Sequence, residues 1–390
     1  MSKSRGLLAA ALLFGAAGIL AARVAEESAG LPAEAASAMR RIDAEKIRAH
    51  VRFLSHDLLE GRGTGARGGD IAAEYIATQF ALYGLKPAGD DGSFLQRVPM
   101  VGVRTLPETS FALAPANGEP QRLNLLEDYV ANNESQAEVA NIDAPIVFVG
   151  FGIQAPEYNW DDFKGVDLRG KVLMMFVAEP PSDDPKFFKG KALTYYGRWT
   201  YKYEEAARRG AVAALVIHRA DLASYGWEVV RNSWGGERSY LKRDATPKLQ
   251  AAGWVQWEVA NKIVGYGGHD LNKLFDAAQK REFKPIELPV RLRARVWSKL
   301  RPFVSANVVG VLPGSDAARR GEGVLFTAHY DHLGIDPSKS GDNIYNGAMD
   351  NASGCGILLE MARAFASAKA PARSLYFAAV TGEEQGLLGS

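Results

Sequence analysis

The sequence has a single cysteine, and its charges almost cancel. Cys355 is the only thiol in 390 residues, so no disulfide can form within the chain and no zinc site can be built from thiolates. Lys and Arg number 46 and Asp and Glu number 45, which gives a formal net charge of +1 without any basic block. Such a chain gives no sign of binding nucleic acid, and we predict no nucleic-acid partner.

A long apolar run lies at the N-terminus. Lys3 and Arg5 precede an uncharged apolar stretch, residues 6–22, and small residues follow it. This order is typical of a secretory signal peptide, so we predict a signal peptide over residues 1–25 and a secreted or periplasmic protein. The stretch is slightly shorter than the ~20 residues of a membrane-spanning helix, and an uncleaved membrane anchor is the alternative. No cysteine lies near its end, which excludes a bacterial lipoprotein anchor.

The remainder of the chain divides into four parts. Residues 26–40 are rich in Ala, Glu and Ser and are predicted to be a linker. Residues 41–127 begin the main domain, residues 128–289 form a separate inserted domain, and residues 290–390 return to the main domain. The insert is predicted from short apolar runs with turn residues between them.

Two amphipathic helices are predicted at the start of the main domain. Apolar residues recur at helical spacing over Ile42–Leu54 and over Gly69–Tyr83, and Gly84 is suited to end the second helix. Between the two helices lies a glycine-rich turn, Leu59–Gly65.

The C-terminal segment has a strand, loop, helix and strand pattern. Val324–Ala328 and Leu375–Val380 are short apolar runs that suit buried parallel strands, and Ser353–Ser367 has one apolar face at helical spacing. In such a βαβ unit, ligands bind beyond the carboxyl ends of the strands. His329 follows the first strand and a pair of glutamates follows the second, so we expect these side chains to meet.

The polar residues at these strand ends are of the types that bind zinc and neighbouring metals. His329 offers an imidazole, and Asp350 could bridge two metal ions, which in paired sites lie ~3.5–4 Å apart. Because Glu383 and Glu384 are adjacent, one can hold a metal while the other takes a proton from bound water. Asp331 could accept the other ring N–H of His329 and thereby fix its tautomer.

Three motifs contain these residues. They read H-Y-D-H-L-G from His329, G-A-M-D-N-A-S-G from Gly347 and E-E-Q-G-L-L-G-S from Glu383. In this order, and on these elements, they resemble the three motifs of the M28 family of zinc metallopeptidases, which includes many aminopeptidases. Residues 42–96 also resemble the N-terminal helices of that family.

The resemblance implies a role for each polar residue. His329 would be a ligand of one metal, Asp350 the bridge, and Glu384 a ligand of the other metal. Glu383 would be the general base and Asp331 would orient His329. The resemblance further implies two Zn²⁺ ions per chain in the intact protein and a cis peptide bond after Asp350.

The resemblance also implies the fold. We expect an α/β protein with a mixed sheet of the zinc-exopeptidase type, flanked by helices. A mainly-β protease-associated domain would interrupt this sheet, because Gly165–Gly170 and Lys171 resemble that inserted module. In the family, an Asp and a His from beyond the Glu-Glu motif complete the metal site. This chain stops at Ser390, so we expect it to be a C-terminally truncated fragment.

The expected function is hydrolysis of peptide bonds in a peptide or protein substrate. A metal lowers the pKa of bound water toward ~7, and Glu383 would remove the proton and pass it to the leaving amine. An aminopeptidase is the main expectation, and a carboxypeptidase with the same architecture is the alternative. Two further alternatives involve no catalysis. The protein would then be a non-catalytic binding or receptor-like homologue, or an inert fragment.

Overall fold

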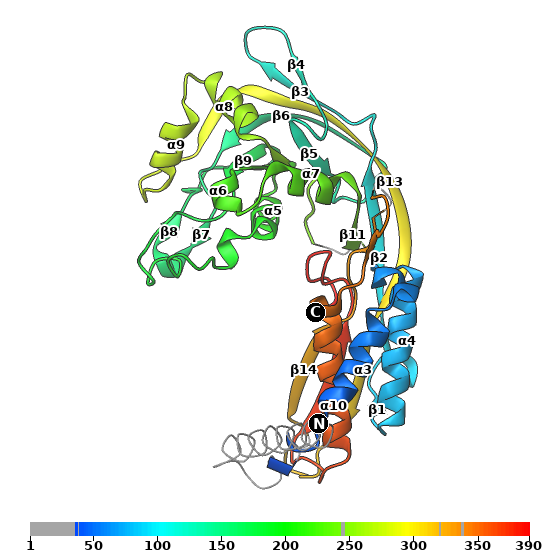
Figure 1. Cartoon of the computed structure of the whole chain (residues 1–390). Helices are drawn as coiled ribbons and strands as arrows, with labels where there is room; N and C mark the ends of the chain where they lie inside the picture. The colour runs from blue at the N-terminus through cyan, green and yellow to red at the C-terminus, as the bar shows by residue number, and fades with distance from the viewer. Residues whose placement is uncertain (1–35, 38, 243–245, 320, 337–338) are drawn as a thin grey trace, which may run out of the picture. The chain divides into compact units, whose positions relative to one another are not determined.

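The computed structural model describes residues 36–37, 39–242, 246–319, 321–336 and 339–390 (Figure 1). The predicted signal peptide and most of the predicted linker lie outside these residues. The chain divides into two compact units. The first, named the site unit, comprises the residues up to Val98 and those from Val304 onward. The second, named the insert unit, comprises Pro99–Phe303.

The site unit contains a small mixed sheet. β14 (Gly323–His329) pairs in parallel with β17 (Ser374–Val380), and β17 pairs antiparallel with the end of β13 (Ile286–Leu312). On the other side, β1 (Lys86–Pro87) pairs antiparallel with β13. The parallel pair that the sequence predicts is therefore confirmed.

Three helices pack with this sheet. They are α3 (Ala44–Leu54), α4 (Arg67–Leu82) and α10 (Ser353–Ala366), within two residues of their predicted bounds (Figure 1). α10 contacts β14 and β17 and also lies against α3, where a Cβ on Gly356 would stand 3.1 Å from the carbonyl oxygen of Ile47. The buried residues of these elements form one hydrophobic core, which includes Phe80 and Phe377.

A βαβ unit thus supplies the frame of the site, as the sequence predicts. Two short elements complete it. The 3₁₀ turn η1 (Asp57–Arg62) joins α3 to α4, and the π-type turn η5 (Ala348–Ala352) leads into α10. β15 (Gly334–Ile335) and β16 (Ile344–Tyr345) form a hairpin in the loop between β14 and η5.

The insert unit is built on parallel strands. β6 (Val139–Phe148), β9 (Val172–Phe176), β10 (Ala213–Ile217) and β12 (Ala251–Val255) pair side by side, and β5 (Tyr129–Asn132) pairs antiparallel with β12. The central strands β9, β10 and β12 are buried along their whole length, which explains their continuous apolar sequences.

Among the described residues of this part of the chain, further strands and five α-helices follow. The strands are β2 (Leu95–Thr105), β3 (Ser110–Pro115), β4 (Gln121–Leu123), β7 (Gln154–Ala155), β8 (Trp160–Asp161) and β11 (Glu237–Leu241). The helices are α5 (Trp199–Arg208), α6 (Ala220–Ala223), α7 (Trp227–Gly235), α8 (Trp257–Gly265) and α9 (Leu271–Ala278). The fold is therefore the expected mixed α/β type, with a mixed sheet flanked by helices.

The insert unit begins earlier and ends later than the predicted insert of residues 128–289. Both β2 and β13 contribute residues to each unit, so no turn or change of composition marks the boundary in the sequence. The identity of this unit as a protease-associated domain stays a prediction.

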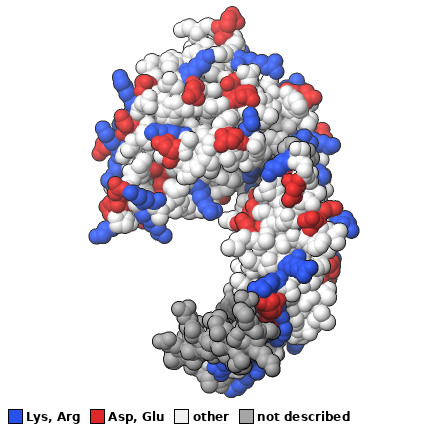
Figure 2. All heavy atoms as spheres, in the orientation of Figure 1, with Lys and Arg blue, Asp and Glu red and all other residues white. Residues whose placement is uncertain are grey.

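Two surface properties bear on function. Figure 2 shows basic and acidic side chains intermixed over the visible face of the insert unit. Within the described ranges, no helix combines the length and the apolar character that crossing a membrane would demand.

Candidate metal centre

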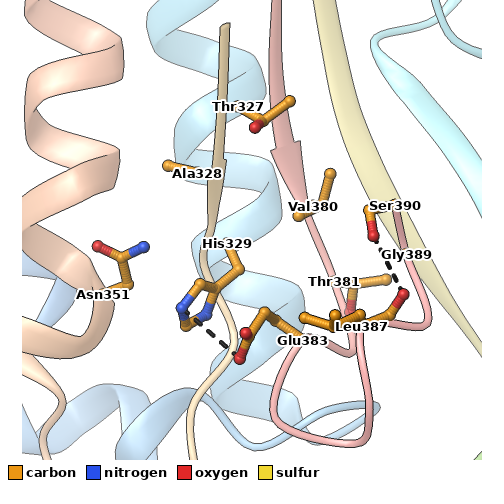
Figure 3. A pocket seen from close by; sticks show the side chains of 10 residues that line it. All are labelled: Thr327, Ala328, His329, Asn351, Val380, Thr381, Glu383, Leu387, Gly389 and Ser390. Atoms are coloured by element: carbon orange, nitrogen blue, oxygen red, sulfur yellow. Dashed lines mark hydrogen bonds and ion pairs between the residues drawn. The ribbon is translucent and has the colours of Figure 1, made fainter. Parts of the chain in front are cut away.

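His329 and the two glutamates meet at the carboxyl end of the parallel strand pair. His329 is the last residue of β14 and is in register with Val380, the last residue of β17. Glu383 and Glu384 follow Val380 after a short turn, so both lie at the same edge of the sheet. The Nε2 atom of His329 lies 3.8 Å from Oε2 of Glu383, and Figure 3 shows the two side chains facing each other.

Asp350 reaches this edge from the turn that precedes α10. It lies in η5, and its peptide bond to Asn351 is cis, as the resemblance predicts. Its Oδ1 atom lies 3.0 Å from Nε2 of His329, and two thirds of its side chain (66%) is exposed to solvent. The turn therefore presents an accessible carboxylate directly to the imidazole.

The hydrogen bond of the second ring nitrogen fixes the tautomer of His329. Nδ1 lies 3.1 Å from the backbone carbonyl oxygen of Asp331, which can only accept, so Nδ1 carries the proton. The lone pair of Nε2 is then available to a metal. The predicted partner was the Asp331 carboxylate, whose Oδ1 lies 3.8 Å from Nδ1, beyond hydrogen-bond distance.

The Asp331 carboxylate has other partners. It is fully buried, its Oδ2 accepts from the hydroxyl of Thr64 at 2.8 Å, and its Oδ1 accepts from the backbone N–H of Glu383 at 3.1 Å. Burial raises its pKa, and the hydrogen bonds from Thr64 and Glu383 oppose this shift. Asp331 thus holds the loop that carries the two glutamates.

Glu384 is paired with the second histidine of the first motif. Its Oε1 atom lies 2.6 Å from Nδ1 of His332. Burial raises the pKa of Glu384, His332 lowers it, and the neighbouring charges of Asp350 and Glu383 raise it further. A cation at this position would therefore relieve repulsion among three carboxylates.

Three of these residues fit a metal ion. One ligand atom from each of His329, Asp350 and Glu384 lies within 4.8 Å of the others. One imidazole nitrogen and two carboxylate oxygens form a donor set that suits zinc. The structure thus brings together the three residues predicted as ligands, with Glu383 beside them.

A pocket of about 250 Å³ opens next to His329 and Glu383 (Figure 3). Its lining includes these two residues, further polar side chains such as Asn351, and apolar side chains such as Val380 and Leu387. The lining residues are Thr327, Ala328, His329, Asn351, Val380, Thr381, Glu383, Leu387, Gly389 and Ser390.

Arg62 and Thr64 are site residues that the sequence did not reveal. The Arg62 guanidinium is fully buried and donates to carbonyl oxygens in the segments that carry His329 and Asp350. Thr64 bonds Asp331. Their sequence signal was the glycine-rich turn Leu59–Gly65, which predicts a turn and not its partners.

Cys355 has a structural environment. It is buried at the start of α10, and its thiol donates to the carbonyl oxygen of His329 at 3.2 Å. Burial raises the pKa of Cys355 to about 12, so the thiol stays protonated. This agrees with the predicted absence of a thiolate ligand.

The family comparison matches the segment that contains the site. Residues 307–390 match the sequence model of Peptidase family M28. A "Probable zinc metalloprotease" of Pyrenophora teres f. teres is 42% identical over 90 residues, which cover 23% of this chain and 18% of that protein. A protein of the same description from Pyrenophora tritici-repentis is 41% identical over 90 residues, which cover 23% of this chain and 20% of that protein.

Solved aminopeptidases are similar over a longer span. An aminopeptidase from Aneurinibacillus sp. strain AM-1 has a TM-score of 0.48 and 20% identity, covering 90% of this chain and 65% of that protein. A zinc aminopeptidase from Bacillus subtilis has a TM-score of 0.37 and 20% identity, covering 89% of this chain and 64% of that protein. The matches thus cover less than two thirds of each of these relatives. The sequence similarity to Peptidase family M28 thus lies in residues 307–390, the part of this chain that carries the site.

Proposed function

We propose that the protein is a zinc-dependent aminopeptidase that releases N-terminal residues from peptides. The observation that carries the proposal is the convergence of His329, Asp350 and Glu384 within 4.8 Å, at the carboxyl ends of two parallel strands. The descriptions of the similar proteins, zinc metalloproteases and aminopeptidases, support the same assignment.

Each residue has a distinct part in this proposal. Bound zinc would polarise the peptide carbonyl and acidify a water molecule. His329, Asp350 and Glu384 would contribute to holding the two zinc ions that the resemblance implies. Glu383 faces the same space with its side chain about one third exposed (35%), so it can accept the proton of the attacking water and return it to the leaving amine. The carboxylate of Asp331 accepts from the backbone N–H of Glu383 and so keeps Glu383 in place.

The pocket favours the N-terminal over the C-terminal end of a peptide. A carboxypeptidase must bind a carboxylate, which usually requires Arg or Lys. Among the described residues that line the pocket beside His329, one is a carboxylate and none is Lys or Arg. Apolar residues such as Val380 and Leu387 would surround a substrate side chain, while the negative charge of Glu383 would attract a nearby ammonium group.

The test compares Glu383→Gln with the unchanged protein, both in the intact form that the resemblance implies and both loaded with zinc. We expect hydrolysis of aminoacyl-arylamides with a free amine, and about a 10²–10⁴-fold loss of kcat/KM in Glu383→Gln because a general base is removed. Zinc content should remain the same, since Glu383 is not a proposed ligand. Glu74→Gln, an exposed glutamate on α4, is the matched control and should retain full activity.

Other results would point to other functions. Cleavage of N-acetylated peptides from their free C-terminus would support the carboxypeptidase alternative. Zinc binding without hydrolysis of any peptide would support a non-catalytic homologue. A chain that neither binds zinc nor cleaves peptides would contradict the proposal.

We also propose that the protein acts outside the cytoplasm. The support is the order of basic, apolar and small residues over 1–25, which lies outside the described part of the structure. N-terminal sequencing of protein recovered from the periplasm or the medium should find a start near residue 26. An intact N-terminus in the membrane fraction would instead indicate the uncleaved anchor.

A further inference from the structure

From the structure we infer that Arg62 and Thr64, on the glycine-rich turn Leu59–Gly65, are positioning residues that set the distance between the metal ligands. The inference rests on the proposed function, because it concerns the same metal site. It assigns a role to a segment that contains none of the candidate ligands.

The backbone of the turn directs Arg62 into the interior. Glu60, Gly61 and Arg62 all have positive φ values, of 50°, 66° and 49°. At Gly61 a Cβ would collide with the carbonyl oxygens of Gly334 and Tyr345, 2.6 Å from the latter. The turn is therefore packed directly against the loop that lies between β14 and η5, and the Arg62 side chain is fully buried beneath it.

The Arg62 guanidinium connects the two segments that carry His329 and Asp350. Nε donates to the carbonyl oxygen of Tyr330, the residue after His329, at 2.7 Å. Nη1 donates to Asn346 O at 2.7 Å and Nη2 donates to Gly347 O at 2.9 Å, three residues before Asp350. One rigid, planar group thus fixes the separation of both segments.

A further bond of the same group anchors it to the helical frame. Nη1 also donates to the carbonyl oxygen of Leu54, the last residue of α3. In addition, the backbone carbonyl oxygen of Arg62 accepts from the N–H of His332 at 3.0 Å. His332 contacts Glu384, so the turn also borders the third candidate ligand.

Thr64 extends the same support to the glutamates. Its hydroxyl donates to Oδ2 of Asp331, and Oδ1 of Asp331 accepts from the N–H of Glu383. A single buried carboxylate therefore transmits the position of Thr64 to the loop of Glu383 and Glu384. Residues that orient metal ligands in this way typically change metal affinity by about 10–100-fold when mutated.

The positive charge of Arg62 is consistent with this positioning role. The hydrogen bonds of Arg62 go to carbonyl oxygens, yet its positive charge acts through space on Asp331, Asp350 and Glu384. The guanidinium therefore offsets part of the repulsion among the carboxylates while leaving their oxygens available to a metal. A lysine has one ammonium nitrogen and cannot reach all of these carbonyl groups at once.

The test measures zinc affinity by competition with a chromophoric chelator, and the visible spectrum of the Co²⁺-substituted chain. Thr64→Val removes the hydroxyl with little change of shape, and we expect zinc affinity to fall about 10–100-fold with an altered Co²⁺ spectrum. Thr64→Ser should restore both. Arg62→Lys should weaken binding at least as much. Arg67→Lys, an exposed arginine five residues further on, is the matched control.

Thermal unfolding separates positioning from general support of the fold. Thr64→Val should unfold within a few degrees of the unchanged chain while binding zinc more weakly. Zinc affinity and a Co²⁺ spectrum that are unchanged in Thr64→Val would overturn the inference. A lowered unfolding temperature with unchanged affinity would overturn it as well.

The experiment also distinguishes this inference from the proposed function. An unchanged chain that binds no zinc would overturn both. An unchanged chain that binds zinc without cleaving peptides would refute only the peptidase activity. In that case weaker zinc binding by Thr64→Val would still support the positioning role.

Discussion

Gly61 is the residue on which the packing of the turn Leu59–Gly65 depends. Its φ of 66° costs a non-glycine residue about 1–2 kcal/mol, and its missing Cβ leaves space for the carbonyl oxygens of Gly334 and Tyr345. We expect Gly61→Ala to lower the free energy of unfolding by about 2–4 kcal/mol, measured by urea denaturation.

Gly92 allows the cost of a positive φ to be separated from the cost of close packing. Gly92 also has a positive φ, of 73°, but a Cβ there would meet no atom within 4 Å. Gly92→Ala should therefore show the backbone cost alone, about 1–2 kcal/mol. Equal losses in the two variants would refute the argument that close packing against the loop carbonyls demands glycine at position 61.

At the scale of single residues, the candidate metal ligands could be predicted from the sequence, but the residues that position them could not. His329 and Glu384 follow apolar runs that identify strand ends, and Asp350 precedes a clear helical pattern. Arg62 and Thr64 act on residues 268 and 267 positions away, and nothing near them in the sequence marks those partners. The bond from His329 to the backbone carbonyl of Asp331 was likewise hidden, because a sequence names side chains and not carbonyl directions.

Among the elements, α10 is joined to α3 by a buried charge. Glu360 on α10 is fully buried and accepts from the backbone N–H of Asp43, the N-cap of α3, at 2.8 Å. It also accepts from Arg363 at 2.6 and 2.7 Å. Burial acts to raise the pKa of Glu360, but the bonds from Arg363 and Asp43 outweigh it and hold the pKa below its ordinary value of 4.5.

This shift predicts a pH dependence of stability. Because the folded pKa lies below the unfolded one, the ionised Glu360 stabilises the fold above about pH 4.5, and this contribution is lost as the pH falls through the folded pKa. Glu360→Gln should therefore have a lower unfolding temperature at pH 6 and a smaller further loss down to pH 3. Glu74→Gln, which is exposed, should follow the unchanged chain, and parallel curves for Glu360→Gln would contradict the prediction.

Helices and strands with a clear local sequence pattern could be predicted. α3, α4 and α10 and the strands β14 and β17 begin and end close to their predicted bounds, since apolar spacing and a glycine such as Gly84 mark them. The bounds of the insert could not be predicted in this way, because β13 extends over 27 residues from one unit into the other. A continuous strand offers no turn residues from which a domain boundary could be recognised.

At the scale of the whole molecule, each unit has a hydrophobic core of its own. One cluster of buried residues lies within the site unit, and two lie within the insert unit. Within the described residues, none of these clusters combines residues of both units. Separate cores make separate cooperative unfolding units the expected behaviour.

The tryptophans allow the two units to be observed separately. All seven lie between residues 99 and 303, so intrinsic tryptophan fluorescence reports only the insert unit. The proposed zinc ligands all lie in the site unit. A ligand stabilises the unit to which it binds, by about 2.7 kcal/mol at a free concentration one hundred times its dissociation constant.

We therefore expect zinc to raise the unfolding temperature of one calorimetric transition and to leave the tryptophan fluorescence transition almost unchanged. Removing the metal with a chelator should reverse the shift. Asp350→Ala should abolish it without moving the fluorescence transition, because Asp350 is exposed and belongs to the site unit. If zinc shifted the fluorescence and calorimetric transitions equally, the two units would unfold as one, and the division into independent cores would have to be abandoned.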